Sequence, residues 1–202
     1  MNNIRERTVN FAVKNLPILL LLVVTGCAHQ INLTPPLNTL DSDSLASIAK
    51  SVGYYISEED MAKEVETPGG GGDKVKYTPY SDLEPALKHA LANIFSGVHS
   101  VPTLDDRDFI QSNNISYIFV PTIKTDSSSD SILTWPPTDF SISLQCRALN
   151  EAGSTVWETS VEGRGHAEFE QFKHDFSLSA RKAAKEALLK LEREISKAEV
   201  FE

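Results

Sequence analysis

Cysteines, histidines and clustered acidic residues are the side chains that could carry chemistry in this chain of 202 residues. Cys146 is the first candidate nucleophile, because the thiolate form of cysteine is strongly nucleophilic. It lies between Leu144 and Ala148, in the apolar phase of a segment in which apolar and polar residues alternate. This position favours a thiol buried in the core, so we expect no catalytic role for it.

Metal binding is the next possibility, because histidine and aspartate are common metal ligands. His166 and His174 flank the acidic segment AEFEQFK and could form a cluster, although solvated loop residues explain this pattern better. The aspartates of the segment LDDRD lack the glycine and the final glutamate of a calcium loop, which favours a charged helix face. No spacing typical of a zinc site, such as HExxH, joins the histidines His29, His89, His99, His166 and His174. We therefore predict no metal site.

The glycine run from Gly69 to Gly72 could cradle a phosphate group if it joined a strand to the N-terminus of a helix. It lacks the spacing of a P-loop, and the residues DKVKYTPY separate it from the next predicted helix. A flexible loop is the better interpretation. The sequence also lacks the GxSxG motif of many hydrolases. We predict that the protein is not an enzyme and uses no cofactor.

Cys27 differs from Cys146, because it ends an apolar run near the start of the chain. The run from Leu16 to Val24 is too short to span a bilayer, which takes about 20 apolar residues in a helix. Basic residues precede the run and small residues follow it. This order is typical of a secretory signal peptide, which we assign to residues 1–26.

The residues Val24, Thr25, Gly26 and Cys27 resemble the lipobox of bacterial lipoproteins, whose last residue is the lipidated cysteine. The resemblance implies that signal peptidase recognises the first three residues and cleaves before Cys27. It implies a diacylglyceryl thioether on Cys27 and an acyl chain, such as palmitate, on the new N-terminus. Because Ala28 stands where an aspartate would retain the protein at the inner membrane of enteric bacteria, it also implies the outer membrane, with the body in the periplasm. The alternative is a buried apolar helix with an incidental cysteine.

The net charge of −9 argues against nucleic acid as a partner, because binding to phosphate depends on Lys and Arg. Without the basic leader, the remaining chain is more acidic still. The same repulsion weakens electrostatic contact with anionic lipid, so attachment to a membrane needs a hydrophobic anchor. We expect the covalent lipid on Cys27 to be that anchor.

The chain is long enough for one domain with a leader and short tails, since domains usually take about 100 to 200 residues. Residues 27–50 are the predicted lipidated N-terminus and flexible tether, because polar residues and two consecutive prolines dominate them. Residues 51–197 are the predicted periplasmic domain, and residues 198–202 are a predicted C-terminal tail.

Two helices stand out in this domain. The first lies within residues 80–95 and begins with a capping box of Ser81 and Glu84, whereas the second, residues 177–197, has an alanine-rich face that permits close approach to a sheet. A short helix capped by Thr103 lies between them. Strands are predicted at residues 52–56, 98–101 and 115–123, with the last one central and Pro121 where its pairing ends, and residues 140–163 alternate as a β-hairpin.

These elements predict an α+β fold, with a mixed or antiparallel sheet and two principal helices packed on it. The element order, with FSISLQCRALNEAGSTVWETSVEG before an alanine-rich helix, resembles small periplasmic domains. Such domains occur in YajG-type lipoproteins, in the curli-secretion lipoprotein and at the N-terminus of the Tol-system propeller protein. The resemblance extends over residues 50–197.

The segment 127–140 is the candidate surface for binding a partner. Trp135, with its neighbours Pro136 and Pro137, offers a large apolar side chain on a stiff backbone, which needs little ordering on binding. The alternative is that Trp135 packs over the edge of the sheet. We expect a non-enzymatic binding or assembly accessory of the bacterial cell envelope, with an envelope protein as partner and no nucleic acid.

Two other functions remain open. A lipid or glycolipid carrier that assists an envelope transporter would need an apolar cavity between the helices and the sheet. A hydrolase built from loop residues has no motif in its favour.

Overall fold

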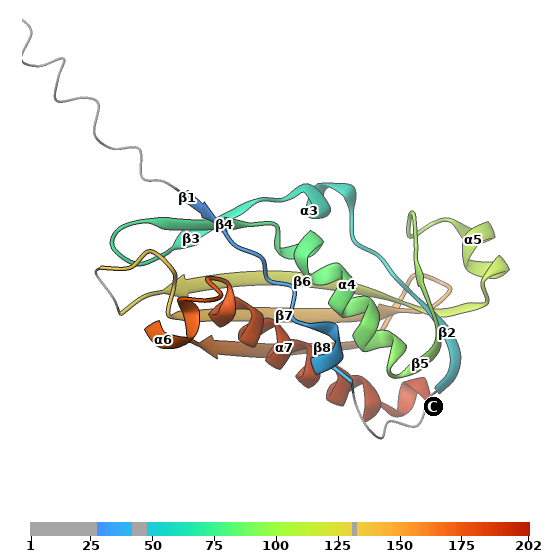
Figure 1. Ribbon diagram of the computed structural model, residues 1–202. Helices are drawn as coiled ribbons and strands as arrows, with labels where there is room; N and C mark the ends of the chain where they lie inside the picture. Colours follow the sequence, from blue (N-terminus) through green and yellow to red (C-terminus); the bar gives the residue numbers. More distant parts are fainter. Residues whose placement is uncertain (1–27, 42–47, 131–132) are drawn as a thin grey trace, which may run out of the picture.

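The computed structural model describes residues 28–41, 48–130 and 133–202. The predicted signal peptide and the lipobox residues, Cys27 included, lie outside the described residues. The described chain is an α+β fold, in which α4 (Pro79–Ala92) and α7 (Leu178–Ser196) pack together on one face of a long sheet (Figure 1). The predicted fold class is therefore confirmed.

The long sheet contains five strands in the order β5-β2-β6-β7-β8. β2 (Ile48–Tyr54) lies parallel to β5 (Phe95–Ser100) and to β6 (Ile115–Ser128). β7 (Asp139–Leu149) and β8 (Thr155–His166) continue from β6 as an antiparallel meander. The predicted hairpin and the predicted central strand are both confirmed. Each prediction used a long and regular apolar pattern, which is a reliable signal of secondary structure.

Strand β6 shows how a proline fits into a central strand. Its pairing with β2 ends at Phe119, whose carbonyl oxygen accepts a hydrogen bond from the N–H of Tyr55. Pro121 lies two residues further along β6, so its backbone nitrogen points to the same side as the Phe119 carbonyl group. Because β2 no longer pairs with β6 at this point, the absence of an N–H group on Pro121 removes no hydrogen bond from the sheet. Pairing with β7 continues on the other side to Ser128. The strand is therefore longer than predicted, since its last residues are polar and carried no apolar pattern.

A second sheet, which the sequence analysis did not predict, joins three short strands in the order β1-β4-β3. β1 (Ala28–Gln30) lies parallel to β4 (Lys74–Tyr77), and β3 (Val65–Pro68) is antiparallel to β4. The glycine run forms the turn between β3 and β4, where Gly71 and Gly72 have positive φ angles of 67° and 86°. The interpretation of this run as a loop is confirmed.

Helix α4 begins earlier than predicted. Its first residue is Pro79 and its N-cap is Thr78, so Ser81 lies within the first turn and does not form the predicted capping box. A proline suits the first position of a helix, because its N–H would have no partner there. Glu84, the other predicted box residue, accepts a hydrogen bond from the Tyr54 hydroxyl group of β2.

The shorter helices surround this framework. The N-cap of α5 (Arg107–Ser112) is Asp106 rather than the predicted Thr103, and its carboxylate accepts a hydrogen bond from the N–H of Phe109 at 3.0 Å. Within the described residues, no helix combines the length and the apolar character needed to cross a membrane. The remaining short elements are α3 (Glu58–Ala62), α6 (Phe169–Phe172), and the 3-10 helices η1 (Leu37–Thr39) and η2 (Glu199–Phe201).

Helix α7 lies unusually close to β8. A Cβ atom placed on Gly163 would be 2.0 Å from the carbonyl oxygen of Ala183, and one on Gly165 would be 1.9 Å from that of Ser179. Both glycines share the buried face of β8 with Val161. The predicted close approach of the alanine-rich face is confirmed, and glycines on the strand make it possible.

The same helix also covers part of the free edge of β8. The backbone N–H of Arg164 donates to the Glu186 carboxylate at 2.7 Å, and the Lys190 ammonium group donates to the carbonyl oxygen of Glu162 at 2.7 Å. Edge strands with unpaired backbone groups invite pairing with other chains. These side chains therefore protect the part of the edge that α7 reaches.

Residues 28–41 are not the predicted tether. Ile31, Leu33 and Leu40 are 3%, 0% and 0% exposed, and they belong to the main hydrophobic core. The Asp82 carboxylate of α4 accepts a hydrogen bond from the N–H of Leu33 at 3.3 Å, and the side chain of Asn93, the C-cap of α4, donates to the Leu40 carbonyl oxygen at 2.9 Å. The prediction was wrong because a few widely spaced apolar residues, among many polar ones, are enough to fix the segment to the body.

The predicted C-terminal tail is also part of the core. Phe201 is 0% exposed. Its ring lies 5.2 to 5.9 Å from four other aromatic rings, those of Phe95, Tyr117, Phe119 and Trp157. Five residues carry too little periodicity for a prediction, so only long-range packing reveals their role.

Candidate functional site

Apolar side chains gather on the surface at the end of the long sheet where β6 and β8 finish and β7 begins. The connection between β6 and β7, helix α6 and the segment before α7 supply them. Together with the glycine turn they line an open hollow of about 580 Å³. We call this surface the apolar end, and it consists of Leu133, Trp135, Phe169, Phe172 and Phe176.

Trp135 is the centre of the apolar end. Its ring stacks on the His29 ring of β1, with 4.1 Å between the ring centroids and an angle of 17°. The Phe176 ring lies 4.9 Å away on a tilted plane. The Trp135 carbonyl oxygen accepts a hydrogen bond from the N–H of Gly70 at 2.8 Å. Trp135 is therefore held by the N-terminal strand, the glycine turn and the segment before α7.

The two prolines beside Trp135 have a different position. Pro136 and Pro137 are buried, and the Pro137 carbonyl oxygen accepts a hydrogen bond from the Ser179 hydroxyl group at 2.9 Å. Of the three predicted binding residues, only the half-buried Trp135 keeps a surface that a partner could touch. Its packing against the body corresponds to the alternative that the sequence analysis left open.

The exposed part of the apolar end includes Leu133, which lies in the predicted segment 127–140, and two phenylalanines that the sequence analysis missed. Leu133, Phe169 and Phe176 are 90%, 54% and 48% exposed. Single exposed apolar residues are normal on proteins, whereas a contiguous group marks a surface that contacts something else. Three phenylalanines within the segment FEQFKHDF are the signal that could have revealed it.

Two cationic side chains near the apolar end pair with carboxylates. The His29 ring lies 3.3 Å from the Asp73 carboxylate, and the Arg181 guanidinium lies 3.1 Å from the Asp175 carboxylate. The Lys173 ammonium group likewise pairs with a carboxylate of the same segment. The carboxylates of Glu170 and Asp175 are therefore paired with cationic groups.

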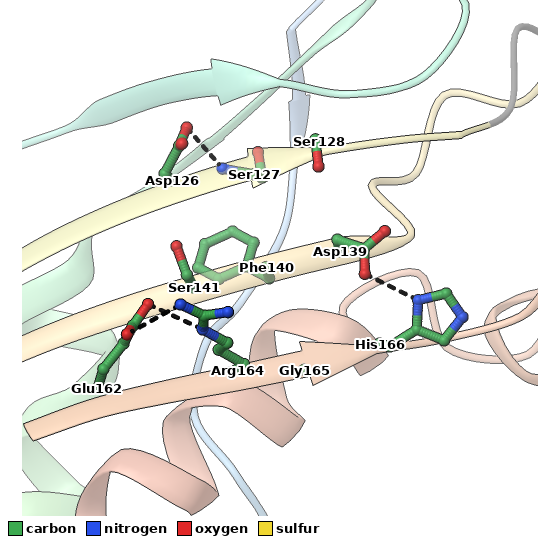
Figure 2. A pocket seen from close by; sticks show the side chains of 10 residues that line it. All are labelled: Asp126, Ser127, Ser128, Asp139, Phe140, Ser141, Glu162, Arg164, Gly165 and His166. Carbon is green, nitrogen blue, oxygen red and sulfur yellow. Dashed lines mark hydrogen bonds and ion pairs between the residues drawn. The ribbon is translucent and has the colours of Figure 1, made fainter.

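A second hollow, of about 380 Å³, lies on the opposite face of the long sheet from the helices (Figure 2). Charged and hydroxyl side chains of β6, β7 and β8 line it. The Arg164 guanidinium pairs with the Glu162 carboxylate there at 3.0 Å. We call it the polar groove, and its polar lining residues are Asp126, Ser127, Ser128, Asp139, Ser141, Glu162, Arg164 and His166.

His166 lines the polar groove and also a smaller hollow that it shares with Phe169 and Phe172 of the apolar end. Its Nδ1 lies 2.8 Å from the Asp139 carboxylate and its Nε2 lies 3.0 Å from the Glu168 carboxylate. The hydrogen bonds to Glu168 and Asp139 raise the pKa of His166 above its usual value. Burial alone would raise the pKa of Asp139, but hydrogen bonds from His166 and Thr138 hold it below its usual value. Because carboxylates engage both ring nitrogens, His166 is poorly placed to activate a nucleophile.

The metal cluster considered around His166 and His174 does not form in the part of the chain that the structure describes, where no group of His, Cys, Asp and Glu is arranged to hold a metal ion. The aspartates of LDDRD take another role. Asp106 caps α5, and Asp108 lies in the first turn of that helix.

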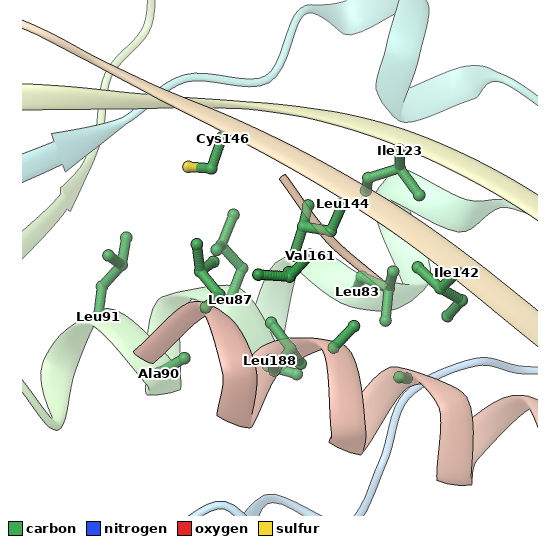
Figure 3. Close-up of a cluster of buried hydrophobic side chains, with 14 of the residues drawn as sticks. Leu83, Leu87, Ala90, Leu91, Ile123, Ile142, Leu144, Cys146, Val161 and Leu188 are labelled. Atoms are coloured by element: carbon green, nitrogen blue, oxygen red, sulfur yellow. The ribbon is translucent and has the colours of Figure 1, made fainter. Parts of the chain in front are cut away.

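Cys146 lies in the centre of the core, among apolar side chains of the sheet and the two helices (Figure 3). It is 0% exposed, which confirms the expected core thiol. Burial raises the pKa of the Cys146 thiol to about 12. A thiol with this pKa remains protonated at neutral pH and has little nucleophilic character.

The burial of Cys146 leads to a testable prediction. In a Cys27→Ser variant, Cys146 is the single thiol of the chain. We expect it to resist a maleimide reagent at pH 7.5 in buffer and to react fully in concentrated urea, because only unfolding exposes the thiolate. Mass spectrometry of the adduct measures both states. Rapid labelling of the folded protein would contradict the burial.

Comparison with known proteins finds no match to any protein-family model and none to a curated protein. Several solved structures have a similar overall arrangement. A Xanthomonas campestris protein of family DUF330 gives a TM-score of 0.48 at 12% identity, with 84% of this chain and 90% of that chain covered. PelC from Paraburkholderia phytofirmans, solved as a dodecamer, gives 0.44 at 12% identity, with 74% and 91% covered. A candidate lipoprotein from Caulobacter crescentus CB15 gives a TM-score of 0.38 at 14% identity, with 80% of this chain and 92% of that chain covered. Similarities as distant as these three carry no functional argument.

Proposed function

We propose that this protein is a lipid-anchored accessory of the bacterial cell envelope, which binds another envelope protein and performs no catalysis. The resemblance of Val24, Thr25, Gly26 and Cys27 to a lipobox supports acylation at Cys27. The observation that carries the proposal is that Ala28, the residue directly after that cysteine, already belongs to strand β1 of the folded body. We place the anchor in the outer membrane and the body in the periplasm.

The position of the anchor has a physical consequence. Ala28 pairs with Lys74 in the small sheet, and His29 stacks on Trp135. The acyl chains therefore leave from a fixed point on the body, not from the end of a long flexible segment. Each buried methylene contributes about 0.8 kcal/mol, so several acyl chains hold the protein to the membrane durably.

Replacement of Cys27 by serine tests the anchor. We expect Cys27→Ser to keep its leader, to carry no lipid and to lose the acyl-dependent association with membranes, because serine cannot form the thioether. Mass spectrometry and detergent phase partitioning measure the two effects. The matched control is Cys146→Ala, which removes the other cysteine and should be acylated normally. A native protein with a free Cys27 thiol and an intact leader would refute the proposal.

A partner protein has two candidate contact surfaces on the described residues. One is the exposed part of Trp135, which the sequence analysis selected. The other is the polar groove, which offers charges of both signs on an uncovered sheet face and which suits a polar protein surface.

Site-specific photo-crosslinking in intact cells distinguishes them. A crosslinking residue at Ser141 samples the polar groove, and one at Phe169 samples the apolar end. We expect the first to give a reproducible protein adduct, and one at the exposed Leu104 serves as the control elsewhere on the body. The absence of any protein adduct from both test positions would argue strongly against a binding accessory.

The lipid-carrier alternative finds no support at the main contact between helix and sheet. The carrier would need an apolar cavity between these layers. Gly163 instead brings β8 into direct contact with the backbone of α7. A Cβ atom placed on Gly163 would lie only 2.5 Å from the backbone nitrogen of Ala187. Phospholipid that copurifies with the body at a fixed ratio would restore this alternative.

A further inference from the structure

The residues that directly follow the proposed lipid anchor contact the apolar end. His29 is the second residue after Cys27, and consecutive Cα atoms are about 3.8 Å apart. The His29 ring stacks directly on Trp135 at 4.1 Å. Figure 1 shows β1, β3, β4 and α6 at the same end of the molecule. Acyl chains on Cys27 would therefore begin beside the apolar end.

The composition of the apolar end matches the boundary between lipid headgroups and acyl chains. Tryptophan is enriched at that boundary, and Phe and Leu form the inserting face of peripheral membrane segments. Leu133, Phe169 and Phe176 project from the body with 90%, 54% and 48% of their surface exposed. The half-buried Trp135 lies behind them in the same hollow.

The charges of the apolar end permit this contact although the chain as a whole is acidic. Asp175 pairs with Arg181 and Glu170 pairs with Lys173, so these nearby carboxylates have cationic partners. The contact would therefore depend on apolar burial and not on attraction to anionic headgroups. A zwitterionic membrane is the corresponding probe.

We propose that the apolar end is a membrane-contact surface, which inserts into the headgroup and acyl-chain boundary of the bilayer that holds the anchor. This inference rests on the proposed acylation of Cys27. The anchor keeps lipid beside this surface at a high effective concentration, which favours lipid over a soluble protein as the occupant. The body would then lie against the membrane in one fixed orientation, with the polar groove free for a protein.

Depth-dependent fluorescence quenching tests this surface. The chain contains two tryptophans, Trp135 and Trp157. Trp157 lies nine residues before the end of β8, which places it about 30 Å along the strand from the apolar end. In the full-length acylated protein, Trp157→Phe leaves Trp135 as the reporter, and Trp135→Phe leaves Trp157 as the matched control.

Both variants are reconstituted into phosphatidylcholine vesicles with brominated acyl chains. We expect Trp135 to lose most of its emission and Trp157 to keep its own. Adding Phe169→Glu and Phe176→Glu to the Trp135 reporter should restore the emission, whereas Val156→Glu, at an exposed site near Trp157, should not. Circular dichroism on each variant checks that the fold is retained.

The outcomes separate this inference from the proposed function. Acylated protein in vesicles with an unquenched Trp135 would overturn the membrane-contact surface and leave the anchor intact. A protein adduct, in place of a lipid adduct, from a crosslinking residue at Phe169 would overturn it as well. A free Cys27 thiol in the native protein would overturn both.

Discussion

Phe201→Ala is expected to lower the free energy of unfolding by about 3 to 5 kcal/mol, which is the usual cost of removing a buried phenyl ring. The ring is fully buried against four aromatic rings that belong to β5, β6 and β8. Its loss leaves a cavity at the opposite end of the long sheet from the apolar end. Urea unfolding followed by circular dichroism measures the change.

Val200→Ala is the matched control, because Val200 is adjacent in the chain and 38% exposed. Its effect should remain within about 0.5 kcal/mol, as for most surface substitutions. Equal stability of the two variants would show that the last residues are the tail that the sequence suggested. The Lys50 ammonium group also donates to the Phe201 carbonyl oxygen at 2.9 Å, which helps to hold the ring in place.

Gly163→Ala is the second substitution with a large expected effect. The new methyl group would lie 2.0 Å from the Ala183 carbonyl oxygen and 2.5 Å from the Ala187 nitrogen, both of which are backbone atoms of α7. No side-chain rotation can relieve such a contact, so the whole helix must move away from β8. Overpacking usually costs about 1 to 3 kcal/mol, and we expect the upper end of this range or more.

Thermal unfolding measures this loss, and Ser160→Ala on the same strand is the control. Ser160 lies on the exposed face of β8, so removal of its hydroxyl group does not change the contact between β8 and α7. Its substitution should leave the melting temperature almost unchanged. A Gly163→Ala variant as stable as Ser160→Ala would show that α7 does not pack on β8 at this distance.

The elements that the sequence predicted well are those in which many residues repeat one pattern. The β7–β8 hairpin, β6 and α7 each bury one regular face, and the period of that face identifies the element. The alanine-rich face of α7 even indicated a close contact. The partner in that contact, the pair Gly163 and Gly165, was given no role in the sequence analysis, which ended the hairpin at residue 163.

The misassigned segments are those in which single residues make long-range contacts. Leu33, Leu40 and Phe201 lie in polar surroundings in the sequence, yet each is fully buried. Likewise, Ser81 and Thr103 match capping patterns, but Thr78 and Asp106 cap the two helices in the structure. Local rules cannot decide between neighbouring caps, because packing of the helix against the sheet selects its start.

The sequence by itself determined the α+β class, the principal helices and the candidate anchor at Cys27, because each depends on a local pattern that can be read along the chain. Only the tertiary structure decided that β1 joins the small sheet, that His29 stacks on Trp135, and that Phe169 and Phe176 extend the same surface. More than 100 residues separate His29 from Trp135 in the chain. Their meeting depends on the burial of the whole core, which no local pattern encodes.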